Sequence, residues 1–203
     1  DNTTTFPQTM YVDYVRVFEK NGFSAPNAPE LNIEEETVGQ LIEPSLAQNA
    51  IKDDFPDLGN AIVVVYGGGG EPVVEASDLA VDGDSSLVFN FPGGGWGGAY
   101  IELESPVDLS SYNYIKFLLN KPSDLTNAEI KLESPTTNFA VFLQDYTGSE
   151  VEQGFMEYSI PLADFSGLDL TEITIPFAMW NPQDVNQNFI EGPVYIDRIY
   201  FSE

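Results

Sequence analysis

The sequence predicts an all-β protein built as a two-sheet β-sandwich of the jelly-roll type. Apolar and polar residues alternate over short runs, clusters of Gly, Pro, Asn and Asp interrupt these runs, and Tyr, Phe, Val and Ile are abundant. β-Branched and aromatic side chains fit a pleated, half-buried surface. Nine strands are expected from this pattern, enough for two stacked sheets: Ala61–Tyr66, Ser86–Phe91, Ala99–Leu103, Tyr114–Leu119, Glu129–Glu133, Ala140–Asp145, Phe155–Ile160, Glu172–Met179 and Val194–Phe201.

The first quarter of the chain has a different character. Met10–Phe18, MYVDYVRVF, alternates as a strand does, and Asn21–Pro29 has the proline-rich and small-residue composition of a linker. The apolar spacing in Glu34–Ile42 fits either a short helix stopped by Pro44 or an acidic linker. The predicted organisation is therefore a terminal strand of an upstream domain at 1–20, a linker at 21–51 and the sandwich module at 52–203.

The composition excludes several classes of function. The chain has no Cys and no His, which removes thiol nucleophiles, zinc sites built on these residues and every mechanism that needs an imidazole. With 7 Lys and Arg against 33 Asp and Glu, the net charge of −26 repels phosphate backbones and anionic membrane surfaces. Nucleic acid is therefore not an expected partner. The same carboxylates suit calcium, which prefers oxygen ligands.

No apolar run approaches the length of a membrane span, so membrane insertion is not expected. The start at Asp1 shows neither the basic region nor the apolar core of a signal peptide, as in a mature or excised piece. We expect a monomer that is secreted or held at the cell surface.

Phe6–Phe18, FPQTMYVDYVRVF, closely resembles the final strand of bacterial family 16 glycoside hydrolases, especially laminarinases that cut β-1,3-glucans. That resemblance implies an upstream hydrolase domain in cis. The family's catalytic Glu-x-Asp-x-x-Glu motif occurs nowhere in this chain, so no catalytic residue is predicted and the hydrolase active site is absent here.

The part of the chain from Lys52 to Glu203 is similar to the galactose-binding-like jelly-roll modules that are appended to such enzymes. The similar stretches, in order, are DDFPD, DGDSSLVFNF, GGGWGGAYIEL, SPVDLSSYNYIKF and VYIDRIYF. The resemblance implies a carbohydrate-binding module. The sequence departs from the usual pattern of those modules at Val63–Val74, where the modules are more varied.

The same resemblance implies a structural calcium ion that ties the first strand to the last. Carried over by position, its ligands would come from Asp54, Asp57, Asp82, Asp84 and Asp197. Clustered carboxylates repel one another unless a cation neutralises them. The alternative is a set of turn aspartates that bind their own backbone.

Sugar binding in a β-sandwich uses an aromatic ring to cover the apolar face of a pyranose, with polar groups that bind its hydroxyls. Trp96 lies between glycines that leave its indole accessible. Trp180 is the first residue of WNPQD, which is expected to form a loop that also carries Asn181 and Gln183. Both indoles are predicted to bind sugar. Packing in the core or against a sheet is the alternative for each.

Alternation adds further candidates to the predicted sugar site. If Ile115 and Ile130 face the core, then Tyr114, Lys116 and Lys131 point outward and could line one groove. Tyr100 lies on the polar face of the strand that follows Trp96. The alternative for the two lysines is that their charges neutralise nearby carboxylates on a solvent-exposed face of the sheet.

The leading interpretation is a non-catalytic carbohydrate-binding module that holds a polysaccharide, a β-1,3-glucan such as laminarin, and targets an attached hydrolase to it. This choice of ligand depends on Phe6–Phe18 rather than on the binding face. The second interpretation is a calcium-stabilised structural or adhesion sandwich without sugar binding. A third makes the chain a lyase that uses Tyr and Lys as acid and base.

Overall fold

The computed structural model describes residues 41–42, 61–82 and 85–203, which belong to one unit of the chain, residues 35–203. These residues form twelve strands and two three-residue 3-10 helices, η1 (Leu143–Asp145) and η2 (Leu162–Asp164). The strands are β1 (Leu41–Ile42), β2 (Ala61–Gly68), β3 (Val73–Ser77), β4 (Ser86–Pro92), β5 (Trp96–Leu103), β6 (Tyr114–Asn120), β7 (Asn127–Glu133), β8 (Asn138–Phe142), β9 (Ser149–Glu150), β10 (Met156–Pro161), β11 (Ile175–Gln183) and β12 (Glu191–Ser202).

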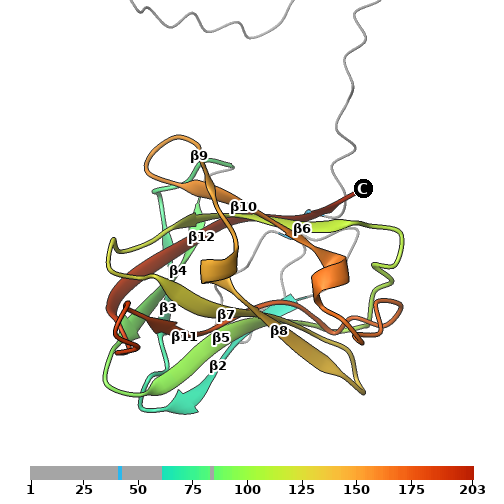
Figure 1. The fold of residues 1–203 in the computed structure, drawn as a ribbon, viewed down its shortest axis with the longest axis horizontal. Helices are drawn as coiled ribbons and strands as arrows, with labels where there is room; N and C mark the ends of the chain where they lie inside the picture. The colour runs from blue at the N-terminus through green and yellow to red at the C-terminus, as the bar shows by residue number, and fades with distance from the viewer. Residues whose placement is uncertain (1–40, 43–60, 83–84) are drawn as a thin grey trace, which may run out of the picture. The chain divides into compact units, whose positions relative to one another are not determined.

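The strands form two antiparallel sheets, which confirms the predicted two-sheet β-sandwich. The five-stranded sheet has the order β2-β5-β11-β7-β8, and the seven-stranded sheet has the order β3-β4-β12-β6-β10-β9. β1 joins the second sheet beside β12, at Ile199 and Tyr200. Figure 1 shows β6, β10 and β12 in one layer above β2, β5 and β11 in the other.

Alternating side chains from both sheets meet in a single core. On β7, Ala128, Ile130 and Leu132 are fully buried, while the residues between them point outward. The Phe117 ring of β6 lies 5.1 Å from that of Phe177 on β11, in an edge-to-face contact that joins the two sheets. Apolar side chains thus fill the inner faces of the two sheets, and the outer face of each sheet does not contribute to this core.

All nine predicted strands are present with shifted ends, and the strand predicted over Ala140–Asp145 is wrong in its second half, because Leu143–Asp145 form η1. β1, β3 and β9 were not predicted. The short helix considered for Glu34–Ile42 is wrong at its end, because Leu41 and Ile42 form a strand that pairs with β12. That strand lies within the segment predicted as linker; the domain boundaries themselves stay predictions. In the part of the chain that is described, no helix has the length and apolarity to cross a bilayer.

The loop predicted from Trp180 to Gln183 is also wrong, because β11 continues through these residues. Trp180 pairs with Gly98 of β5 and Glu129 of β7. The register shifts between Trp180 and Gln183, which accommodates the proline at 182. This extension places the indole on the sheet instead of beyond its end.

Candidate functional site

The outer face of the five-stranded sheet carries aromatic side chains at its β2, β5 and β11 positions. Ala99 and Ile101 of β5 face the core, so Tyr100 and the residues in phase with it point outward. Tyr66 of β2 and Trp180 of β11 are both paired with Gly98, on opposite sides of β5. The sheet therefore brings together aromatic residues that are more than a hundred positions apart in the chain.

Glycines beneath the two indoles let them lie against the sheet. A Cβ atom at Gly98 would stand 2.7 Å from Cε3 of Trp180, and one at Gly68 would collide with Nε1 of Trp96. Any larger residue at these positions would lift the indole away from the backbone. The glycine run at 67–70 supplies the end of β2 and the surface beneath Trp96.

The aromatic rings contact one another as well as the sheet. The ring of Tyr66 lies edge-on to Trp96 and Trp180, with centroids 5.7 and 6.4 Å apart. Tyr100 stacks on Trp180 at 6.2 Å with an interplanar angle of 27°. Tyr66 is 62% exposed and Trp96 is 46% exposed. These large rings are thus held in place by neighbours while their free faces remain open to solvent.

These rings form one wall of a groove with a volume of about 500 Å³. Its lining combines aromatic, charged and amide side chains: Tyr66, Trp96, Tyr100, Glu129, Lys131, Glu133, Ile175, Trp180 and Asn181. An apolar surface with a few convergent polar groups is the usual composition of a small-molecule or oligosaccharide site.

Asn181 fixes the polar side of the groove across three strands. Its Oδ1 accepts a hydrogen bond from the backbone N–H of Gly97 (3.2 Å), and its Nδ2 donates to Oε1 of Glu129 (2.8 Å). The backbone of Asn181 has a φ of 52°, a conformation that Asn tolerates better than most residues. The amide and the carboxylate are therefore oriented before any ligand arrives.

The remaining polar groups are a salt bridge and a phenol. Nζ of Lys131 lies 2.7 Å from Oε1 of Glu133, both on the outer face of β7. Burial raises the pKa of Tyr100, and the charges of Glu102 and Glu133 raise it further. The phenol of Tyr100 therefore stays protonated at neutral pH and is able to donate a hydrogen bond.

Trp180 contributes a donor that the described part of the fold leaves unused. Its Nε1 is buried and has no hydrogen-bond partner among the described residues. An unpaired buried N–H costs about 1–3 kcal/mol. Such groups are rare, and this one lies beneath the surface of the groove wall rather than on it.

The structure brings together five of the eight predicted sugar-binding residues. Trp96, Trp180, Tyr100, Lys131 and Asn181 line the groove. Gln183 does not line it; it pairs with Asn127 farther along β11, and its carbonyl accepts the N–H of Thr126. Trp96 is exposed and is therefore not a core residue, although it does lie against the sheet over Gly68.

The prediction that Tyr114, Lys116 and Lys131 share a groove is wrong. Tyr114 and Lys116 lie on β6 of the seven-stranded sheet, whereas Lys131 lies on β7 of the other sheet. The Nζ atom of Lys116 instead lies 5.6 Å from the centroid of the Tyr200 ring. Alternation correctly predicted which side chains point outward, but it cannot assign a strand to a sheet.

Four groove residues were not among the predicted site residues: Tyr66, Glu129, Glu133 and Ile175. Both glutamates are in phase with Lys131 on β7, so strand alternation was available as a signal for them. Tyr66 is in phase with Val64, and together they mark the outer face of β2. Ile175 precedes a register shift in β11, which strand periodicity does not reveal.

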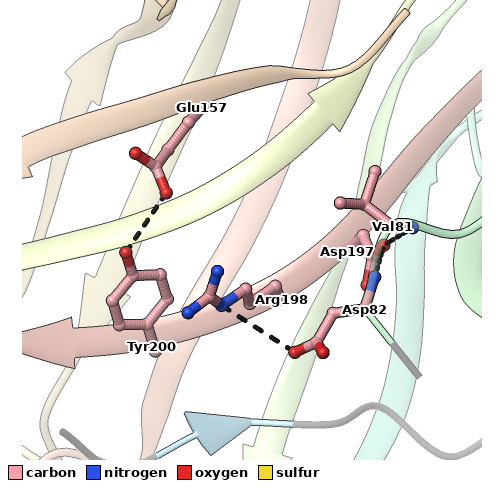
Figure 2. A network of polar contacts seen from close by, with 6 residues as sticks. All are labelled: Val81, Asp82, Glu157, Asp197, Arg198 and Tyr200. Carbon is pink, nitrogen blue, oxygen red and sulfur yellow. Dashed lines mark hydrogen bonds and ion pairs between the residues drawn. The ribbon is translucent and has the colours of Figure 1, made fainter. Parts of the chain in front are cut away.

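The described aspartates of the predicted calcium site are held by protein groups (Figure 2). Asp197 is only 4% exposed, and its Oδ2 accepts hydrogen bonds from the backbone N–H groups of Val81 (2.6 Å) and Asp82 (3.1 Å). Oδ2 of Asp82 lies 3.8 Å from Nε of Arg198. Neither contact is that of a turn aspartate that binds its own backbone, because Asp197 binds residues far away in the chain and Asp82 contacts an arginine.

The other predicted ligands, Asp54, Asp57 and Asp84, lie outside the described residues. Among the residues that are described, no three acidic side chains gather as a metal site would require. Asp82 and Asp197 alone therefore do not make a calcium site, because calcium takes six to eight oxygen ligands. The ion stays a prediction.

The same view shows a second set of contacts on β12. The Tyr200 hydroxyl donates to Oε1 of Glu157 (3.1 Å), and the guanidinium of Arg198 lies 4.9 Å from the centre of the Tyr200 ring. Burial, with a smaller contribution from Glu157, raises the pKa of Tyr200. This network stabilises the outer face of the seven-stranded sheet and lies in the other sheet from the groove.

Comparison with known proteins gives a class of fold. No family model matches the chain, and no curated protein matches it. Among solved structures, the family 30 carbohydrate-binding module of a cellulosomal cellulase from Clostridium thermocellum has a TM-score of 0.53 at 17% identity, over 70% of this chain and 92% of that chain.

A family 11 carbohydrate-binding module from Clostridium thermocellum, in complex with a β-1,3-1,4-mixed-linked tetrasaccharide, is also similar. Its TM-score is 0.48 at 16% identity, over 74% of this chain and 93% of that chain. At these identities the comparison with the family 30 module supports the β-sandwich fold and leaves function to be argued from the groove.

Proposed function

We propose that the sandwich is a non-catalytic carbohydrate-binding module and that the groove on the five-stranded sheet holds the sugar. The observation that carries this proposal is the cluster of four aromatic rings whose indoles lie over glycines of the sheet. Polar side chains that are already held by hydrogen bonds lie beside this cluster. Trp96 and Trp180 offer faces for the apolar side of a pyranose. Asn181, Glu129 and the protonated phenol of Tyr100 are placed to bind hydroxyl groups. The shared fold with the family 30 module supports the same assignment.

The polar groups of the groove do not suit catalysis. The backbone positions of Glu129 and Glu133 lie about 14 Å apart along β7, at about 3.4 Å per residue, and the two carboxylates are held by different partners, Asn181 and Lys131. A lyase that used Tyr100 as a base would need a lowered pKa, whereas its surroundings raise it. The ammonium group of Lys131, the other proposed lyase group, is engaged in a salt bridge with Glu133. Binding without bond cleavage is the chemistry that this arrangement supports.

The ligand that we propose is a β-1,3-glucan such as laminarin, and the protein is secreted or at the cell surface. Support for the glucan comes from Phe6–Phe18, which resembles the last strand of a family 16 hydrolase. We propose that residues 1–20 close such a domain and that 52–203 keep it near its substrate as a monomeric module. Tethering raises the local substrate concentration even where each module binds weakly.

Affinity electrophoresis and calorimetry test this proposal. We expect retardation in gels that contain laminarin and weaker or no retardation with algal galactans, because the linkage changes the faces that a pyranose presents. Binding to mixed-linkage glucan but not to laminarin would support the module and reject the proposed linkage. Indifference to all three polymers would favour the structural or adhesion interpretation.

We also propose that calcium binds with Asp54, Asp57, Asp82, Asp84 and Asp197 as candidate ligands. A ligand that binds only the folded state raises its stability by mass action. Calcium added after EDTA treatment is therefore expected to raise the melting temperature, measured by calorimetry. Equal melting temperatures in EDTA, calcium and magnesium would reject the calcium site. The backbone hydrogen bonds to Asp197 would then be sufficient to hold this carboxylate in place without an ion.

A further inference from the structure

Phe142, on edge strand β8, extends the groove face beyond the residues that line the groove. Its ring is 46% exposed. Val141 is buried in the core and Phe139 packs against it, so Ala140 and Phe142 point to the outer face of the five-stranded sheet. Phe142 is paired with Glu129, whose carboxylate lines the groove.

The pairing register places Phe142 in a single row that crosses all five strands. From β2 to β8 this row consists of Tyr66, Gly98, Trp180, Glu129 and Phe142, each paired with the next. Aromatic rings therefore stand at both ends of the row and at its centre. An isolated exposed phenylalanine needs no explanation. Phe142 is not isolated, because it is in register with residues that line the groove and could contact the same ligand.

The spacing of the row indicates the size of the ligand. Neighbouring strands lie about 4.8 Å apart, so Phe142 is about 10 Å from the Trp180 position and about 19 Å from the Tyr66 position. This is wider than one pyranose ring. A ligand that touches both Trp180 and Phe142 must be an oligosaccharide whose chain runs across the strands.

The charges along the row indicate the chemical class of that ligand. Between Trp180 and Phe142 lies the carboxylate of Glu129, and the nearby Lys131 is paired with Glu133. The chain as a whole carries a net charge of −26. Sulfated or uronic-acid polymers would meet uncompensated negative charge here, whereas a neutral glycan would find hydroxyl acceptors.

We propose that Phe142 is a second aromatic subsite and that the module prefers neutral linear glycans long enough to reach from Trp180 to Phe142. The subsite rests on the proposed function and names its substrate class more closely. Phe142 has no polar atom, so it contributes by covering the apolar face of a distal sugar ring. Its effect must therefore depend on the length of the chain.

Calorimetry with laminari-oligosaccharides and mixed-linkage gluco-oligosaccharides, from disaccharide to hexasaccharide, tests the subsite. With Phe142→Ala we expect the affinity for the hexasaccharide to fall about tenfold while that for the disaccharide is unchanged. Phe142→Tyr should retain the affinity for the long chain. Val73→Ala is the control, because Val73 is also exposed and apolar on an edge strand but belongs to the other sheet.

Each outcome distinguishes the subsite from the proposed function. If the unaltered protein binds and Phe142→Ala matches it at every length, the subsite is wrong and the groove stands. An equal loss for disaccharide and hexasaccharide would also reject it, since that pattern indicates a general disturbance of the sheet. Tighter binding to an alginate or sulfated galactan oligosaccharide would overturn the preference for neutral chains. No binding by the unaltered protein would overturn the proposed function and the subsite together.

Discussion

Trp180→Ala is expected to lower glucan affinity by about 100-fold, equivalent to ~2.7 kcal/mol. Trp180 touches Tyr66 and Tyr100 and covers Gly98, so its loss removes the centre of the groove. Calorimetric titration with the polymer that the unaltered protein binds measures this change. Trp96→Ala should have a smaller effect, because Trp96 lies at the open end of the ring cluster.

Two comparisons separate a loss of binding from a loss of folding. Trp180→Phe keeps a smaller ring over Gly98, so it should retain part of the affinity. The melting temperature of each variant shows whether the sandwich persists. An unchanged affinity in a folded Trp180→Ala protein would place the sugar somewhere other than this groove.

Asp197→Ala is expected to destabilise the protein by about 2–4 kcal/mol. The carboxylate is buried and accepts two backbone N–H groups, and its removal leaves both donors without this partner. Urea unfolding in EDTA gives the free energy of unfolding without any contribution from calcium. Asp197→Asn, which keeps one acceptor oxygen, should lose less.

An exposed aspartate provides the control for this second change. Asp184 also accepts backbone N–H groups, from Asn186 and Asn188, but on an exposed loop. Water replaces its hydrogen bonds more readily, so Asp184→Ala should cost less than Asp197→Ala. Equal losses for the two variants would show that burial does not set the strength of the Asp197 contacts.

The strands were predictable from the sequence where local alternation determines them. β7 shows this well, with three buried apolar residues between four outward polar ones. β3, VVEAS, has an exposed edge-strand pattern without clear alternation, and β1 exists through its pairing with β12. Such strands depend on partners far away in the chain, which periodicity does not contain.

The site was predictable in part for the same reason. Glycines around Trp96 indicated an accessible ring, and the indole does lie exposed above Gly68. The composition of WNPQ indicated a loop, but pairing with β5 and β7 overrode it. Tyr66 was missed because its importance comes from the register that sets it opposite Gly98. Register is a long-range property, fixed only when the strands have met.

The position of β12 has a consequence for the timing of folding. This strand lies between β4 and β6 in the seven-stranded sheet, yet it is the last of the described strands in chain order. During synthesis, β4 and β6 therefore leave the ribosome without the neighbour that each requires. Sandwiches with such long-range pairing fold slowly. We therefore expect the core to close, and the domain to fold cooperatively, only after β12 has been synthesised.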